Sequence, residues 1–192
     1  MRTPLKPLGL FLLLVSSALA APKEKEREET LILASNRSVA ITVPVGFVYS
    51  SGREENGLLM ARIANAKETV TLQVQFQPDP DGRLGTEQRQ MDFLAQICRQ
   101  YAEGSVEKGY DFKPLEPRAG SGTYCTFTDA SLAGHDVPKG EFLNVTTGTK
   151  VWSGWALVFT LLSNDTTSKD YQTVLRLMKE SFSEKPAAGP KL

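Results

Sequence analysis

The sequence has 192 residues, of which 41% are hydrophobic and 23% are charged, a composition typical of globular proteins. Its 22 basic residues balance its 22 acidic residues, so no basic excess is present to neutralise the phosphates of a nucleic acid. These values argue against a nucleic-acid-binding protein and indicate one medium-sized domain that can bury a substantial core.

Residues 1–20 have the three parts of a secretory signal. Arg2 and Lys6 form its basic region, 8–15 is an apolar segment too short to span a bilayer, and 18–20 is an A-x-A cleavage motif. We predict cleavage after Ala20, which gives a periplasmic or secreted protein that does not span a membrane. An uncleaved membrane anchor is the alternative.

Residues 21–29 are dominated by charges of alternating sign and are predicted to form a solvated leader ahead of a single domain over 30–183. Within that domain, Leu31–Ala34 and Val39–Val43 flank a turn-rich break and predict a first hairpin. The alternation of apolar and small polar residues in its second arm favours a strand with one buried face.

A second hairpin is predicted from Leu58–Ala64 and Thr69–Phe76, after a polar loop at 52–57. Its second arm alternates between two kinds of side chain. The residues predicted to point inward are Val70, Leu72, Val74 and Phe76, and those predicted to point outward are Thr69, Thr71, Gln73 and Gln75.

Thr86–Tyr101 is predicted to be a helix, with Thr86 as its N-cap. Its apolar stripe consists of Met91, Leu94, Ile97, Cys98 and Tyr101, which places Cys98 on the buried face. A following strand, Thr123–Asp129, carries Cys125. Because disulfides persist in exported compartments, we predict a bond between these two cysteines; the alternative is that both are reduced and packed in the core.

A third hairpin is predicted from Glu141–Thr149 and Trp155–Leu162, across a turn at 150–154. The second of these strands is apolar on both faces, which is typical of a central strand covered on both sides. The last element, Ser168–Phe182, is predicted to be an amphipathic helix that begins in a capping box, and the tail at 184–192 is expected to be loose.

The order of these elements is hairpin, hairpin, helix, strand, hairpin and helix. Short turns between consecutive strands favour antiparallel pairing, and the two helices are available to cover opposite faces of the sheet. We therefore predict an α+β fold, a three-layer α/β/α sandwich with a mainly antiparallel sheet of about six to seven strands and a helix on each face.

The sequence Ile41–Phe47, ITVPVGF, has a strand followed by Pro, any residue, Gly and an aromatic residue. This opening, the mid-chain helix and the last strand running into a terminal helix resemble the superfamily named for PsbP and Mog1, which includes exported bacterial proteins of the DcrB kind. Thr123–Ser131 and Phe159–Asp165 are similar to a group of uncharacterised exported bacterial proteins. The resemblance implies a three-layer fold and a binding or assembly role, with no catalytic residues to transfer.

Candidates for catalysis and metal binding are few. His135 is the only histidine and lies in a loop beside Asp136, so a small hydrolase or a thiol enzyme built on His135 is kept as the alternative function. Asp79–Gly82 begins like a calcium loop, but Arg83 stands where a ligand is required, and a turn explains the segment. We predict no metal site, no cofactor and no enzyme activity.

The preferred interpretation is a noncatalytic, monomeric binding or accessory protein whose partner, a protein or a small molecule, is unknown. Trp152 beside a Gly-containing turn is the preferred contact residue, at the tip of the third hairpin; the alternative is that it folds over the edge of the sheet. The long polar loops at 52–57, 78–85, 108–122 and 133–140 are expected to carry the remaining contacts.

Overall fold

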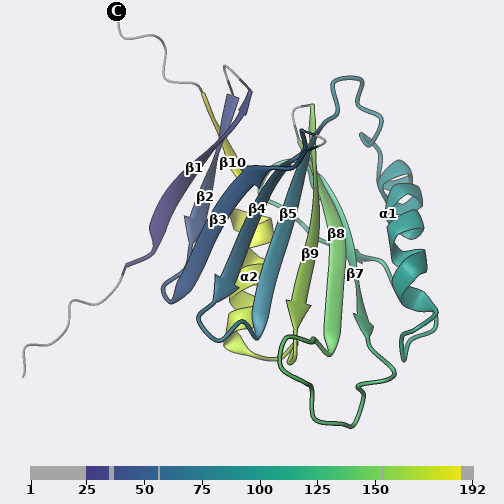
Figure 1. The fold of residues 1–192 in the computed structure, drawn as a ribbon. Helices are drawn as coiled ribbons and strands as arrows, with labels where there is room; N and C mark the ends of the chain where they lie inside the picture. Colours follow the sequence, from purple (N-terminus) through teal and green to yellow (C-terminus); the bar gives the residue numbers. More distant parts are fainter. Residues whose placement is uncertain (1–24, 35–36, 56, 153, 187–192) are drawn as a thin grey trace, which may run out of the picture.

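The structure is a computed structural model that describes residues 25–34, 37–55, 57–152 and 154–186. The predicted signal segment, its cleavage site and the last residues of the predicted tail, 187–192, lie outside the described residues. The described residues form two sheets and two helices, which Figure 1 shows in place. In chain order the elements are β1 (Arg27–Ala34), β2 (Arg37–Val43), β3 (Phe47–Arg53), β4 (Leu59–Asn65), β5 (Val70–Pro78), α1 (Glu87–Ala102), β6 (Lys113–Pro114), β7 (Ser121–Thr128), β8 (Asn144–Trp152), β9 (Trp155–Ser163), α2 (Lys169–Glu180) and β10 (Ser183–Pro186).

Seven strands form the larger sheet in the order β3-β4-β5-β9-β8-β7-β6, and all neighbouring strands are antiparallel. The α+β class and the mainly antiparallel sheet are therefore confirmed. Strand β9 lies at the centre, as its two apolar faces predicted. On one face Leu157, Phe159 and Leu161 are fully buried, whereas side chains on the other face, such as Val158 and Leu162, are half-buried.

Helix α2 covers one face of the larger sheet and lies behind β3 to β5 in Figure 1. Its N-cap is Ser168, whose hydroxyl accepts a hydrogen bond from the backbone N–H of Tyr171 at 3.2 Å. The predicted apolar stripe is confirmed, since Tyr171, Val174, Leu175, Met178 and Phe182 are all buried. Phe182 lies beyond the end of the helix and packs against Phe76 with ring centroids 6.1 Å apart.

Helix α1 begins after Thr86, whose hydroxyl accepts a hydrogen bond from the Arg89 backbone N–H at 3.4 Å, as predicted for the N-cap. Its buried side chains include Leu94 and Cys98, and its contacts are concentrated on β7 and β8. The expectation of a helix over each face of the sheet is thus met only in part, and the three-layer arrangement is not confirmed. Neither helix of the described part of the chain has the length and apolar content needed to cross a bilayer.

The smaller sheet, in the order β1-β2-β10, contains two departures from the predictions. Residues 27–29 of the predicted leader pair with β2 as part of β1, and residues 183–186, of which 184–186 belong to the predicted tail, pair with β2 from its other side as β10. Arg37 holds β10 in place through a bidentate ion pair with Glu184, at 2.6 and 2.9 Å. The first hairpin is confirmed, and Leu31, Val39 and Ile41 bury its inner face in the main core.

Candidate functional site

The register of the larger sheet assigns each side chain to one of its two faces. Arg62, Gln73, Thr160, Thr147 and Cys125 are successive partners across β4, β5, β9, β8 and β7, so all five point to the same face. Cys125 contacts α1, which identifies this as the face on the α1 side. Because α1 packs on β7 and β8, the remainder of this face lacks a helix above it. We call the part formed by β3, β4, β5 and β9 the open face.

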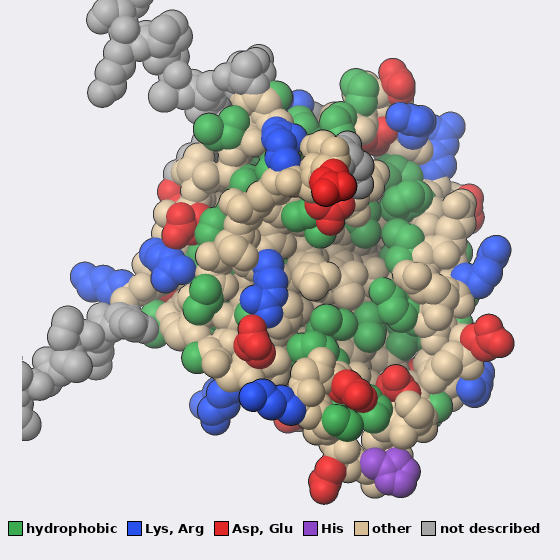
Figure 2. Space-filling model, in the orientation of Figure 1, with side chains coloured by type: hydrophobic (Ala, Val, Ile, Leu, Met, Phe, Trp, Pro, Cys, Tyr) green, Lys and Arg blue, Asp and Glu red, His purple; other side chains and the backbone are tan. Residues whose placement is uncertain are grey.

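The floor of the open face is mostly uncharged. Among its side chains, Met60, Arg62, Gln75, Gln77, Val158, Thr160 and Leu162 are half-buried, Gln73 and Val48 are exposed, and Thr71 is buried. Figure 2 shows this face as hollowed at its centre, with most charged side chains gathered around the rim. The three glutamines occupy alternate positions of β5, so successive amides stand about 7 Å apart along the strand.

Two adjoining cavities open onto this floor. The first, of about 400 Å³, lies where segment 137–142 reaches over the ends of β4, β5 and β9, and Glu141, Phe142 and Asn164 line its wall. The second, of about 350 Å³, runs along β3 and β4. Arg62 and Gln73 line both, which makes the two cavities one continuous depression. Volumes of this size are typical of sites for small molecules.

Hydrogen bonds hold the overhanging segment in place. The backbone N–H of Leu143 donates to the Asn164 side-chain oxygen at 3.0 Å, and the Leu143 carbonyl accepts from the Asp129 N–H at 2.8 Å. On the other rim, Arg62 donates to Glu68 across 3.1 Å, and both side chains are exposed, so their charges offset each other locally. The arrangement leaves amide and hydroxyl groups as the main hydrogen-bonding chemistry of the floor.

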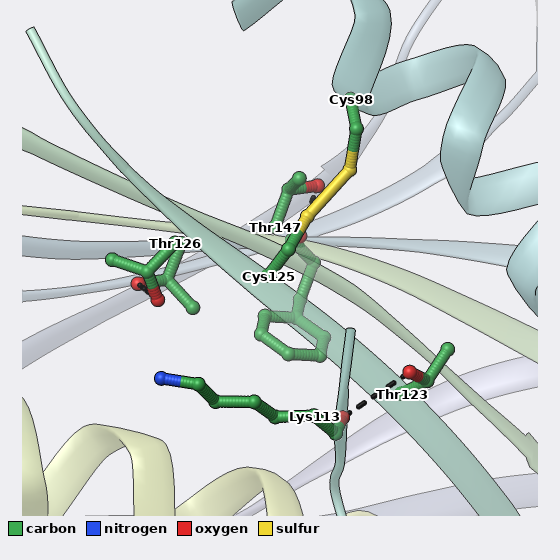
Figure 3. The surroundings of a disulfide bond; sticks show 8 residues. Cys98, Lys113, Thr123, Cys125, Thr126 and Thr147 are labelled. Carbon is green, nitrogen blue, oxygen red and sulfur yellow. Dashed lines mark hydrogen bonds between the residues drawn. A yellow bond between two sulfur atoms is a disulfide. The ribbon is translucent and has the colours of Figure 1, made fainter. Parts of the chain in front are cut away.

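The pair Cys98 and Cys125 fixes α1 beside the open face. The two residues are 27 positions apart, both are fully buried, and their sulfur atoms lie at disulfide distance. Figure 3 shows the link running from α1 down to β7. Leu94 and Phe127 complete a small core around it, separate from the main core. This arrangement agrees with the predicted disulfide, and it fixes α1 at the side of the open face.

Trp152 does not have the exposure that a contact role requires. The prediction placed it at a hairpin tip, but β8 continues through Trp152, which pairs with Trp155 at the end of the hairpin. Alternation then places its side chain on the α2 face with Lys150, and it is only 7% exposed within the main core. The expected exposure of Trp152 is therefore contradicted, and the alternative, packing over the sheet, describes its position.

His135 is exposed in the loop after β7, and the structure does not join it to a carboxylate. His135 does not line the cavity that includes Asp129, and it does not line the cavity that includes Glu141. Asp129 instead accepts hydrogen bonds from the backbone N–H and hydroxyl of Ser131, at 2.8 and 2.6 Å, and these bonds lower the pKa of its carboxyl. The carboxylate holds a turn and has no contact with a histidine.

Asp79, at the start of the calcium-like segment, is buried and forms a turn. Its carboxylate accepts from the backbone N–H groups of Arg83 and Leu84 at 2.8 and 3.0 Å. Across the described ranges, no group of three or more His, Cys, Asp or Glu side chains is arranged to hold a metal ion.

Lys150 is a buried cation that the sequence analysis placed in a turn. Its ammonium donates to the carbonyl of Ser181, the C-cap of α2, at 2.8 Å and lies 5.9 Å from the Trp152 ring centroid. Burial lowers the pKa of Lys150 to about 8. A cation at the carbonyl end of a helix is favoured by the helix dipole, so we assign this residue a structural part in ending α2.

The residues of the open face were not identified as a site from the sequence. The signal was nevertheless present, because Gln73 and Gln75 were correctly assigned to the outward face of their strand. What the sequence lacked was the position of α1, which leaves these side chains uncovered.

This fold is similar to that of cyanobacterial PsbP. The solution structure of PsbP from Synechocystis sp. PCC 6803 matches with a TM-score of 0.48 and 10% sequence identity, over 79% of this chain and 88% of that chain. No protein-family model matches the chain. No curated protein matches it either.

Proposed function

We propose that this chain is an exported, noncatalytic binding module that takes a neutral, hydroxyl-rich ligand, such as an oligosaccharide, on the open face. The observation that carries the proposal is the mostly uncharged floor, rich in glutamine and threonine side chains, beside a cavity of about 400 Å³. Amide side chains both donate and accept hydrogen bonds, so a row of them matches neighbouring hydroxyl groups, which do the same.

The rim supports the same class of ligand. Phe142 lines the cavity and offers an aromatic ring to the apolar C–H surface of a sugar ring. Asn164 adds a further amide at the same end, with its side-chain oxygen already used by Leu143. The charged side chains that line the cavity are Arg62, Lys67, Glu68, Lys139 and Glu141, which nearly balance in sign. Arg62 and Glu68 also pair with each other, which favours a ligand without charge over an ionic one.

The noncatalytic part of the proposal rests on the positions of the candidate residues within the described part of the chain. His135 is exposed and separate from the cavity of the open face, and Asp129 serves a turn. The floor of the open face holds neutral amides and hydroxyls, which bind hydroxyl groups but are poor proton acceptors.

Export is the part of this proposal that rests on the sequence. Residues 1–20 have the pattern of a signal segment, and a buried cysteine pair suits an oxidising compartment. Intact-mass measurement of the protein from the cell-envelope fraction should give a chain that begins at Ala21. A chain that retains residue 1 in that fraction would favour the uncleaved anchor instead. Size-exclusion chromatography of the same sample tests the expected monomer.

The binding proposal is tested with paired glutamine variants. We expect neutral oligosaccharides, screened as a panel of maltotriose, cellotriose and tri-N-acetylchitotriose, to show saturation-transfer NMR signals with the purified chain. Gln73→Ala with Gln75→Ala should weaken binding about tenfold, because each lost hydrogen bond contributes on the order of 1 kcal/mol. The matched control is Gln88→Ala with Gln96→Ala, two exposed glutamines of α1, which should leave the affinity unchanged.

Two results would contradict the proposal. One is that no neutral oligosaccharide of the panel binds the chain at millimolar concentration. The other is that the control pair on α1 lowers the affinity as much as the pair on β5 does. If the chain turns over one of these sugars and His135→Ala abolishes the turnover with the fold intact, the hydrolase alternative holds.

A further inference from the structure

A second depression lies on the opposite side of the larger sheet, between α2 and β7. It has a volume of about 630 Å³, and the side chains that matter for its chemistry are Tyr124, Lys169, Gln172, Arg176 and Lys179. We call it the α2 groove. Tyr124 belongs to the face that Cys125 does not share, because neighbouring residues of a strand point to opposite faces. The α2 groove is therefore separate from the open face.

The α2 groove carries three cations along one stripe of the helix. Lys169, Arg176 and Lys179 are separated by seven and three positions, and all three line the groove. At 1.5 Å of rise per residue, the stripe extends about 15 Å along the helix axis. A single phosphate is much shorter than this, so one such group cannot contact all three cations at once.

These cations have no acidic partner among the residues that the structure describes, since none of the ion pairs found there includes them. The two acidic residues of α2 are engaged elsewhere. Asp170 accepts a hydrogen bond from Asn65 at 2.6 Å, and Glu180 lies 3.9 Å from Arg118. The helix thus concentrates positive charge in the groove although the whole chain has a formal charge of zero.

The wall opposite α2 contributes Tyr124 of β7. Lys113 of β6 is the register partner of Tyr124, but it is not one of the described residues that line the groove. One acidic residue, Glu116, lies close enough to contribute to the raised pKa of the Tyr124 phenol, after burial and Tyr171. The three cations that line the groove face this one nearby carboxylate, so the groove is positive.

We propose that the α2 groove binds a linear polyanion that carries several phosphate groups along its length. The three cations are spread over about 15 Å of the helix axis, so a matching ligand carries its negative charges over a similar length. The concave shape of the groove favours a chain that lies within it over a flat membrane surface. Gln172 and Tyr124 add hydrogen-bond donors at positions between the charges.

The test uses tripolyphosphate and long-chain polyphosphate as probes, measured by isothermal titration calorimetry with the purified chain at low ionic strength, where screening is weak. We expect the longer probe to bind more tightly than tripolyphosphate and orthophosphate to bind weakest. The variant K169Q/R176Q/K179Q should lose about tenfold or more in affinity for the long probe, given the usual strength of exposed ion pairs. Glutamine preserves helix propensity, and circular dichroism checks the fold.

The matched control is R83Q/R89Q/R99Q, which removes three exposed cations that precede or lie on α1. Arg89 and Arg99 are ten positions apart, as are Lys169 and Lys179, so this variant has the same net charge and a similar spacing. Equal loss of affinity in both triple variants would overturn the proposal, because the change in net charge alone would then explain the loss. Binding to phosphatidylglycerol vesicles with none to soluble polyphosphate would also overturn it and would assign the groove to a membrane surface.

Discussion

The two faces of the larger sheet are built in different ways, although the same strands form both. On the α2 face, side chains such as Leu72, Val74 and Phe159 are fully or almost fully buried, and α2 and the smaller sheet join them in one main core. On the α1 face, the core is a small cluster around Leu94 and Phe127 beneath one helix. The rest of that face is the open face.

This difference shows how the fold divides stability from recognition. Burial of apolar area is the principal stabilising term, and most of it lies on the α2 face. The α1 face buries less apolar area, so packing alone holds α1 less firmly than α2. The buried cysteine pair links α1 to β7 on this less firmly packed face. The open face contributes little burial, so its polar side chains are available for a ligand.

The largest expected effect comes from the α2 face. Phe159→Ala removes a fully buried ring from the main core and should lower the free energy of unfolding by about 3–5 kcal/mol. Urea denaturation followed by fluorescence measures the change. A loss below about 1 kcal/mol would mean that this face is not the main source of stability.

The next effect comes from the cysteine pair under α1. Cys98→Ala with Cys125→Ala should lower the free energy of unfolding by about 3 kcal/mol, because the closed loop restricts the unfolded chain. Hydrogen exchange should show the added opening concentrated in α1 and β7, with β5 and β9 protected. Non-reducing peptide mapping of the native protein must find the two cysteines linked, and two thiols that react freely with an alkylating agent would contradict the pairing.

A smaller effect concerns pH and Lys150. Its pKa is lowered to about 8 in the folded protein, below the value of an unfolded lysine, so the unfolded state binds more protons between these two values. Stability should therefore rise as the pH increases from 7.5 to 9.5, by about 1–2 kcal/mol. Lys150→Met should remove this rise, whereas Lys139→Met, at an exposed position, should retain it. Thermal melts across this pH range compare the three proteins.

The smallest effect is expected on the open face. Gln73→Ala with Gln75→Ala should change the free energy of unfolding by no more than about 0.5 kcal/mol, because surface substitutions of this kind remove little packing. The same denaturation experiment used for Phe159→Ala measures it. A loss of several kcal/mol would show that these glutamines stabilise the fold. The open face would then not be a surface that is free to bind a ligand.

The sequence by itself determined the elements whose faces differ in polarity. The alternation from Val70 to Phe76 and the stripe of α2 depend only on local periodicity, which a strand or a helix converts directly into one apolar face. The cysteine pair was also predictable, since a helix stripe placed Cys98 on a buried face and Cys125 lay on a strand. The caps at Thr86 and near Ser168 follow from equally local chemistry.

Tertiary structure alone decided the remaining features, because they depend on partners that are distant in the sequence. Strand β10 and the first residues of β1 form by pairing with β2, and no local sequence pattern indicates with which strand they will pair. Trp152 is buried because β8 extends three residues beyond its predicted end at Thr149, which depends on pairing with β9. Gly148 is required because a Cβ there would approach the Phe159 ring to 2.5 Å.

Both candidate sites belong to this second group. Gln73 faces solvent because α1 packs on β7 and β8 and leaves β5 uncovered, and the cations of α2 face a groove because β7 forms its other wall. The sequence specifies which side chains point away from the main core, since periodicity within one element fixes that direction. Whether another element then covers them depends on the packing of whole helices and sheets, and a pattern within a single element does not contain that information.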